Sequence, residues 1–132
     1  MTPQEIVWFI NHKYGEQAYI VDDGKEIRIF TAKSIWRIFK ADYSKFHGYY
    51  LYHSNNKSGI GFHNQGNHKS GDVNWLIWYA ILHDSNVNIA YTKENYEKFQ
   101  RGYNLYTYGQ KLYESCCQFA FLSGSDLVEG SV

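Results

Sequence analysis

The sequence predicts an α+β fold. One small domain is expected over residues 1–122, with antiparallel hairpins packed with three to five helices, followed by a flexible acidic tail over residues 123–132. Three observations favour this class. Hydrophobic residues make up 44% of the 132 residues and charged residues 20%, which suits a single buried core. Apolar residues recur at helical spacing in some stretches and alternate in others. Turn-forming residues separate the alternating stretches, which indicates hairpins.

The chain opens with the signals of a helix over residues 3–14. Thr2 and Glu5 have the spacing of a capping box, in which each side chain bonds the other's backbone N–H. Gly15 follows the apolar run and is expected to end the helix.

Residues 18–30 are predicted to form a hairpin about Asp23-Gly24, because both residues tolerate positive φ. A two-residue turn at this place sets Ile20 opposite Ile27, with one apolar face and one mixed face.

The next stretch is interpreted as a second helix, capped by Thr31 or Ser34. Its two sides differ in character. The apolar side would carry Ile35, Trp36, Ile38 and Phe39. The polar side would carry Lys33, Arg37 and Lys40.

A second hairpin is expected from Tyr49–His53 and Ile60–His63, across a polar turn. A third helix is predicted over about 73–83, capped by Ser70 or Asp72, and its continuous apolar run indicates deep burial.

The C-terminal part begins with a predicted strand over residues 87–91. Thr92 is expected to cap a helix over about 93–101, ended by Gly102. Residues 103–122 alternate like a strand at first and then recur like a helix, so both interpretations stay open.

The predicted core consists of residues on the apolar faces of these elements. They are Ile6, Ile10, Ile20, Ile27, Ile29, Ile38, Leu76, Ile77 and Ile81.

Residues 1–20 show no signal peptide, and the apolar run Trp75–Leu82 is too short to span a bilayer. Cys116 and Cys117 are adjacent and poorly placed to bridge each other. A reduced, cytoplasmic chain is therefore expected.

The formal net charge is zero, which excludes a uniformly basic nucleic-acid binder or an acidic nucleic-acid mimic. The charge is unevenly distributed, however. Residues 25–69 hold eight Lys and Arg residues against two acidic residues, a net charge of +6, whereas residues 1–24 and 112–132 each carry −3. This basic segment also contains several aromatic residues, and nucleic acids bind where cations meet stacking rings.

We therefore expect a non-catalytic binding protein with no metal or cofactor, whose partner is a nucleic acid, a nucleotide or a host nucleoprotein. Its small size and composition are typical of phage or mobile-element inhibitors of host machinery. The expected binding residues are Arg28, Lys33, Arg37, Lys40, Lys45, Tyr49, Tyr52 and Lys57. A simpler explanation is that the cations form the solvated face of an amphipathic helix.

Two other function classes stay open. His53, His63 and His68 could form a small metal-independent nuclease, with histidines as base and acid. Three imidazoles could also bind zinc, although no recognised metal motif is present. The third class is a protein–protein interaction module with exposed Tyr and Trp. His83-Asp84 could orient an imidazole, but a helix end explains this pair as well.

Overall fold

The computed structural model describes residues 1–43, 46–54, 61–64 and 71–123. The chain divides into two compact units, Met1–Tyr91 and Thr92–Val132, and each is described by itself. The expectation of one domain over residues 1–122 stays a prediction.

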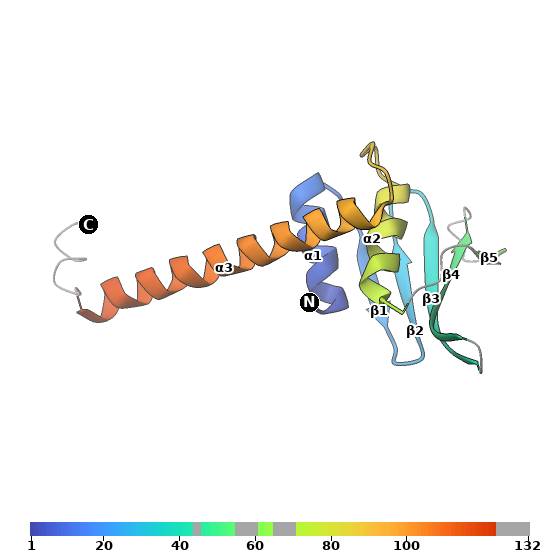
Figure 1. Cartoon of the computed structure of the whole chain (residues 1–132), viewed down its shortest axis with the longest axis horizontal. Coiled ribbons are helices and arrows are strands. Elements are labelled where there is room, and N and C mark those ends of the chain that lie inside the picture. Colours follow the sequence, from blue (N-terminus) through green and yellow to red (C-terminus); the bar gives the residue numbers. More distant parts are fainter. Residues whose placement is uncertain (44–45, 55–60, 65–70, 124–132) are drawn as a thin grey trace. The chain divides into compact units, whose positions relative to one another are not determined.

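The first unit is a five-stranded antiparallel sheet with two helices, which confirms the α+β class (Figure 1). The strands follow one another in chain order across the sheet, β1-β2-β3-β4-β5. Helix α2 contacts β2, β3 and β4, and α1 contacts β1 and α2. The elements are α1 (Pro3–Tyr14), β1 (Tyr19–Asp22), β2 (Glu26–Phe30), β3 (Ile35–Tyr43), β4 (Phe46–Ser54), β5 (His63–Asn64) and α2 (Val73–His83).

Both helices of this unit begin as the sequence predicts. The Thr2 hydroxyl accepts a hydrogen bond from the Glu5 backbone N–H at 3.2 Å, and the Glu5 carboxylate accepts one from the Thr2 N–H. Gly15 ends α1 with a φ of 69°, a conformation that glycine adopts without steric cost. At α2, Asp72 is the N-cap and accepts from the Asn74 N–H.

The core lies between the helices and the sheet face that they cover. Alternation along the strands turns Ile27 and Ile29 of β2, and Trp36 and Ile38 of β3, toward the helices, and all four are buried. All nine predicted core residues are buried, which confirms that part of the prediction.

The first hairpin forms, but its expected register is wrong by two residues. Ile20 pairs with Ile29 instead of Ile27. The cause is the loop, in which the Asp23 carboxylate accepts the backbone N–H groups of Lys25 and Glu26 and so holds a longer turn. A shift of two residues keeps every side chain on its expected face.

The predicted second helix is wrong, because Ile35–Tyr43 is strand β3. Buried Trp36 and Ile38 alternate with half-buried Arg37 and Phe39, which is the period of a strand. Thr31 and Ser34 do not cap a helix. They close the turn between β2 and β3, where the Thr31 N–H donates to the Ser34 carbonyl at 3.1 Å.

The second predicted hairpin is confirmed in part. Strand β4 pairs with β5, with His53 opposite His63 and Tyr52 opposite Asn64, while residues 55–60 lie outside the described residues. On its other side β4 pairs with β3 along its full length.

The predicted strand over residues 87–91 is wrong, since this segment has no regular structure. Alternating apolar residues do not by themselves form a strand. Within the described residues, none of the five strands pairs with this segment.

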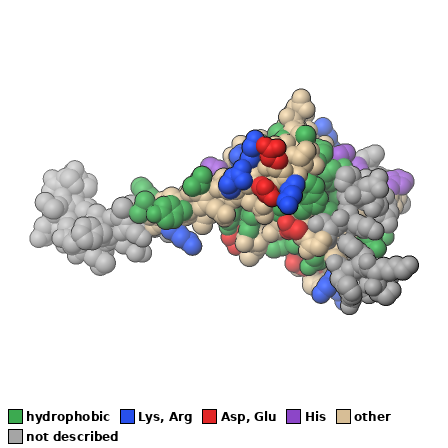
Figure 2. All heavy atoms as spheres, viewed as in Figure 1, with side chains coloured by type: hydrophobic (Ala, Val, Ile, Leu, Met, Phe, Trp, Pro, Cys, Tyr) green, Lys and Arg blue, Asp and Glu red, His purple; other side chains and the backbone are tan. Residues whose placement is uncertain are grey.

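The second unit is built on helix α3 (Lys93–Ser123), which resolves residues 103–122 as helix. Thr92 accepts from the Asn95 N–H, as its predicted capping role requires. The helix does not end at Gly102, because a glycine inside a helix only weakens it. Acidic and basic side chains pair along its first turns, Lys93 with Glu97 and Lys98 with Glu94. On the face of the molecule drawn in Figure 2, Lys and Arg side chains lie beside Asp and Glu side chains. The predicted tail lies outside the described residues from residue 124 onward.

Among the described residues, none of the helices combines the length and the apolar character that crossing a membrane requires.

Candidate functional site

The predicted binding residues separate onto the two faces of the sheet. Arg28, Arg37 and Tyr52 are cross-strand partners in one row and lie on the face opposite α1 and α2. Lys40 and Tyr49 are partners on the other face. The expectation that Arg37 and Lys40 share a surface is therefore wrong. Residues three apart are neighbours on a helix but point to opposite sides of a strand.

Aromatic rings lie against the row of Arg28, Arg37 and Tyr52. The Arg37 guanidinium lies 4.6 Å from the ring centre of Phe39 and 5.1 Å from that of Phe62. The Phe39 and Tyr52 rings meet edge to face at 5.3 Å. We call the surface formed by Arg28, Arg37, Phe39, Tyr52 and Phe62 the Arg37 face. Phe39, which was expected in the core of a helix, and Phe62 were not among the predicted binding residues.

The charges of the Arg37 face are partly neutralised within the fold. Glu26 lies between the two arginines, with one carboxylate oxygen 2.9 Å from Arg28 Nε and the other 2.7 Å from Arg37 Nε. Burial acts to raise the pKa of Glu26, but the hydrogen bonds from Arg37 and Arg28 outweigh it and hold this pKa below its ordinary value. Glu26 is therefore ionised at neutral pH, and the trio carries a net charge of about +1.

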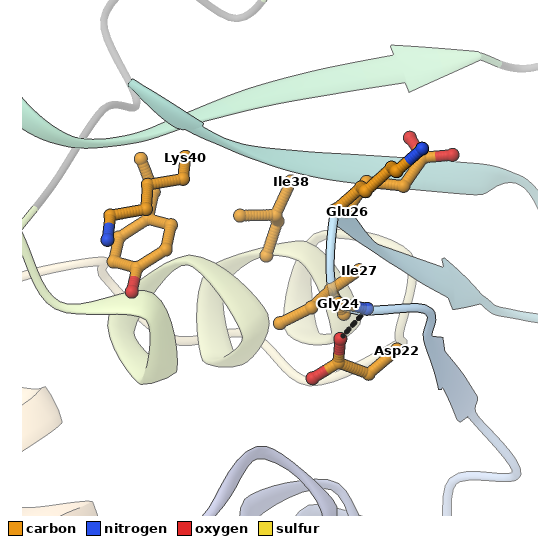
Figure 3. Close-up of a pocket in the computed structure, with 8 residues that line it drawn as sticks. Asp22, Gly24, Glu26, Ile27, Ile38 and Lys40 are labelled. Atoms are coloured by element: carbon orange, nitrogen blue, oxygen red, sulfur yellow. Dashed lines mark hydrogen bonds between the residues drawn. The ribbon is translucent and has the colours of Figure 1, made fainter. Parts of the chain in front are cut away.

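Lys40 and Tyr49 line a pocket of about 210 Å³ beside the turn between β1 and β2. Ile27 and Ile38 form its apolar wall, and Asp22 bonds the Gly24 N–H at its rim (Figure 3). The Glu26 carboxylate points away from the other labelled side chains, toward the opposite face of the sheet. Glu26 also lines the pocket, so the pocket and the Arg37 face adjoin at this residue, although Lys40 and Arg37 lie on opposite faces of the sheet.

The remaining predicted cations lie elsewhere. Lys33 is exposed in the turn between β2 and β3. Lys45 and Lys57 lie outside the described residues.

Two of the three predicted catalytic histidines are neighbours, since His53 and His63 face each other across β4 and β5. His53 is buried and stacks on Trp36 with ring centres 3.7 Å apart, whereas His63 is exposed. His68 lies outside the described residues. The pairing brings these two positions together, and the nuclease hypothesis itself stays a prediction.

A buried carboxylate that sequence analysis did not connect to this region lies beside His53. Asp84 follows the last residue of α2 and accepts hydrogen bonds from the Thr31 hydroxyl at 2.5 Å, from the Ser34 hydroxyl and from Trp36 Nε1 at 2.8 Å. Its other oxygen lies 3.0 Å from His83 Nδ1. The Thr31, Ser34 and Trp36 partners are 48 to 53 residues away along the chain, so no local pattern reveals them.

The proton positions in this cluster follow from the bonding. Ser34 Oγ has one proton, which it donates in the hydrogen bond to the Asp84 carboxylate. His53 Nε2 lies 2.9 Å from Ser34 Oγ. Because Ser34 has no second proton, His53 Nε2 is the donor in this hydrogen bond.

The pKa values in the cluster agree with these proton positions. Burial lowers the pKa of His53, and Asp84 opposes that shift without reversing it. Burial acts to raise the pKa of Asp84, but the bonds from Ser34, Thr31, Trp36 and His83 hold it below the ordinary value. At neutral pH the cluster holds a neutral imidazole beside a carboxylate.

Comparisons with protein-family models, with curated proteins and with solved structures gave no match.

Proposed function

We propose that the chain is a binding protein that holds single-stranded nucleic acid on the Arg37 face. The observation that carries the proposal is the Arg37 guanidinium set against the Phe39 and Phe62 rings, in a row with Arg28 and Tyr52. Guanidinium planes and aromatic rings are the surfaces on which unpaired bases stack, and stacking contributes about 1–3 kcal/mol per base.

The position of the row supports this proposal. Arg28, Arg37 and Tyr52 stand on three adjacent strands, which are spaced about 4.8 Å apart. Among the described residues of Met1–Tyr91, α1 and α2 lie on the opposite face of the sheet. The Arg28 side chain is 50% exposed and that of Arg37 is 27% exposed.

The charge balance decides what kind of binding to expect. Glu26 neutralises about one of the two guanidinium charges, so few phosphates can be paired on this face. Salt dependence for single strands is about −0.7 in log–log slope per phosphate neutralised. We therefore expect a shallow slope of about −0.7 to −1.4, with stacking as the larger contribution to affinity.

The test is fluorescence anisotropy with labelled 12-residue oligo-dT and oligo-U, titrated at several salt concentrations. Tyr52→Ala and Arg28→Gln should each weaken binding about 5- to 100-fold, because each removes a stacking surface or a cation. Lys13→Gln removes the same charge at an exposed position of α1 and should leave the affinity unchanged. Circular dichroism checks that every variant folds.

Glu26→Gln gives a sharper version of the test. Removing the carboxylate frees both arginines, so affinity at low salt should rise and the salt slope should steepen by about 0.7. Equal effects of Arg28→Gln and Lys13→Gln, or no binding of either oligonucleotide by the wild type, would refute the proposal.

Analysis of the oligonucleotides in the same samples tests the nuclease hypothesis. Intact oligonucleotide after long incubation is expected for a binding protein. Cleavage that disappears in His63→Ala would favour the nuclease instead.

A further inference from the structure

The end of β4 and the end of α2 bring together a set of metal-ligating side chains. One ring nitrogen each of His53 and His83 and one carboxylate oxygen of Asp84 all lie within 4.8 Å of one another. We propose that these three residues bind a divalent transition-metal ion of the Zn²⁺ type. This site is separate from the Arg37 face, and the proposal departs from the sequence-based expectation of no metal.

The donor set selects the class of ion. Two imidazoles and one carboxylate suit Zn²⁺, whereas Mg²⁺ and Ca²⁺ prefer oxygen ligands alone. Bond lengths of about 2.0–2.2 Å place the donors of a tetrahedral Zn²⁺ site about 3.4 Å apart. The donor atoms must therefore approach one another by up to about 1.4 Å, and exposed His83 has room to turn.

The surroundings hold two of the ligands in place before any ion arrives. Thr31, Ser34 and Trp36 bond one oxygen of Asp84, which leaves the other oxygen facing His83. The His53 ring is held by its stack on Trp36 and by the hydrogen bond between its Nε2 and Ser34, and the ring nitrogen that binds Zn²⁺ must carry no proton. Such outer hydrogen bonds orient the ligands in metal sites and raise the affinity for the ion.

The site formed by His53, His83 and Asp84 also has a route of entry, and its carboxylate carries the negative charge that a cation requires. The His83 side chain is 42% exposed, whereas that of Asp84 is 5% exposed, so an ion would enter past His83. Bound there, Zn²⁺ would take the place of the proton between His83 and the carboxylate. Three protein ligands would leave the fourth position of a tetrahedral Zn²⁺ for water or another donor.

The experiment uses the full chain, freed of metal by dialysis against a chelator and then titrated with ZnCl₂ by calorimetry at pH 7.5. We expect one equivalent bound with micromolar or tighter affinity. Titration with MgCl₂ or CaCl₂ should show at least 100-fold weaker binding. Co²⁺ should give the visible absorption of a four-coordinate site.

The matched variants are His83→Gln and His12→Gln, which remove one exposed histidine each, from the cluster and from α1 respectively. Glutamine can still donate to Asp84, so His83→Gln keeps the fold. His83→Gln should lose at least 10-fold in Zn²⁺ affinity, and His12→Gln should match the wild type. Saturating Zn²⁺ should raise the melting temperature of the wild type and of His12→Gln only.

A second measurement examines the buried ligand without mutating it. Histidine side-chain NMR signals of His53 and His83 should shift on Zn²⁺ addition, while those of His12 stay in place. The proposal is overturned if Zn²⁺ fails to bind, if His83→Gln binds as tightly as the wild type, or if the His53 signals do not move.

Discussion

Replacement of Asp84 should lower the unfolding free energy of the first unit by a large amount for so small a side chain. Asp84→Ala removes the acceptor of three hydroxyl and indole donors, and two of these, on Ser34 and Trp36, are almost wholly buried. An unsatisfied buried donor costs about 1–3 kcal/mol. With two such donors fully buried and Thr31 partly solvated, the loss should be about 3–5 kcal/mol.

A graded series separates the hydrogen bonds from the charge. Asp84→Asn keeps one acceptor oxygen for the three donors and loses only the ionic contribution, so it should cost about 1–2 kcal/mol. Asn88→Ala, in the exposed segment that follows, should stay within about 0.5 kcal/mol of the wild type.

The assay is urea unfolding followed by Trp fluorescence and circular dichroism, with a chelator present so that no bound metal contributes. For a unit of this size, 3 kcal/mol corresponds to a fall in melting temperature of about 12–24 °C. If Asp84→Ala unfolds within about 1 kcal/mol of the wild type, the cluster does not stabilise the fold as argued.

Three further predictions concern other parts of the first unit. Leu76→Ala should lower the unfolding free energy, measured in urea, by about 2–5 kcal/mol because the side chain is fully buried. Trp8→Ala, at a half-exposed position, should lower it by about 1 kcal/mol or less. Equal losses would place α2 outside the core. Gly15→Ala should lower the unfolding free energy by about 1–2 kcal/mol, since alanine is strained at a φ of 69°, and an unchanged value would contradict the cap. The folded-state pKa of Glu26 lies below its unfolded value, so its ion pairs stabilise the fold above the unfolded pKa and are lost as pH falls through the folded one. The difference in unfolding free energy between wild type and Glu26→Gln should thus be constant above about pH 5.5 and shrink as pH falls through the folded-state pKa. A pH-independent difference would show that the carboxylate's charge is irrelevant.

Local signals along the chain predicted the caps and the core well. The capping box at Thr2, the end of α1 at Gly15 and the N-cap at Asp72 depend on residues within four positions of one another. Burial followed from the apolar faces and survived the register error, because a shift of two residues leaves the faces unchanged.

The segment from Thr31 to Lys40 shows where such reasoning fails. Thr31 and Ser34 are good helix caps and also good turn residues, and the apolar residues after them fit both periods over so short a stretch. The neighbours β2 and β4 decide the outcome, since β3 hydrogen bonds to both. That one error moved Lys40 to the wrong surface and hid Phe39 from the candidate site.

The two sites differ in how far the sequence could have revealed them. The composition of the basic segment pointed to Arg28, Arg37 and Tyr52, and only their grouping had to come from strand pairing. The partners of Asp84 come from a distant turn and strand, so no spacing rule could have assembled that cluster.

The order of the strands has a consequence for how the first unit folds. Each strand pairs with the next along the chain, so the sheet grows by closing short loops, which costs little chain entropy. The bonds from Asp84 to Thr31 and Ser34 instead close loops of 50 to 53 residues. We expect the hairpins to be formed in the folding transition state and the Asp84 bonds to form after it. Asp84→Ala should then accelerate unfolding and leave the refolding rate almost unchanged, which stopped-flow fluorescence can measure.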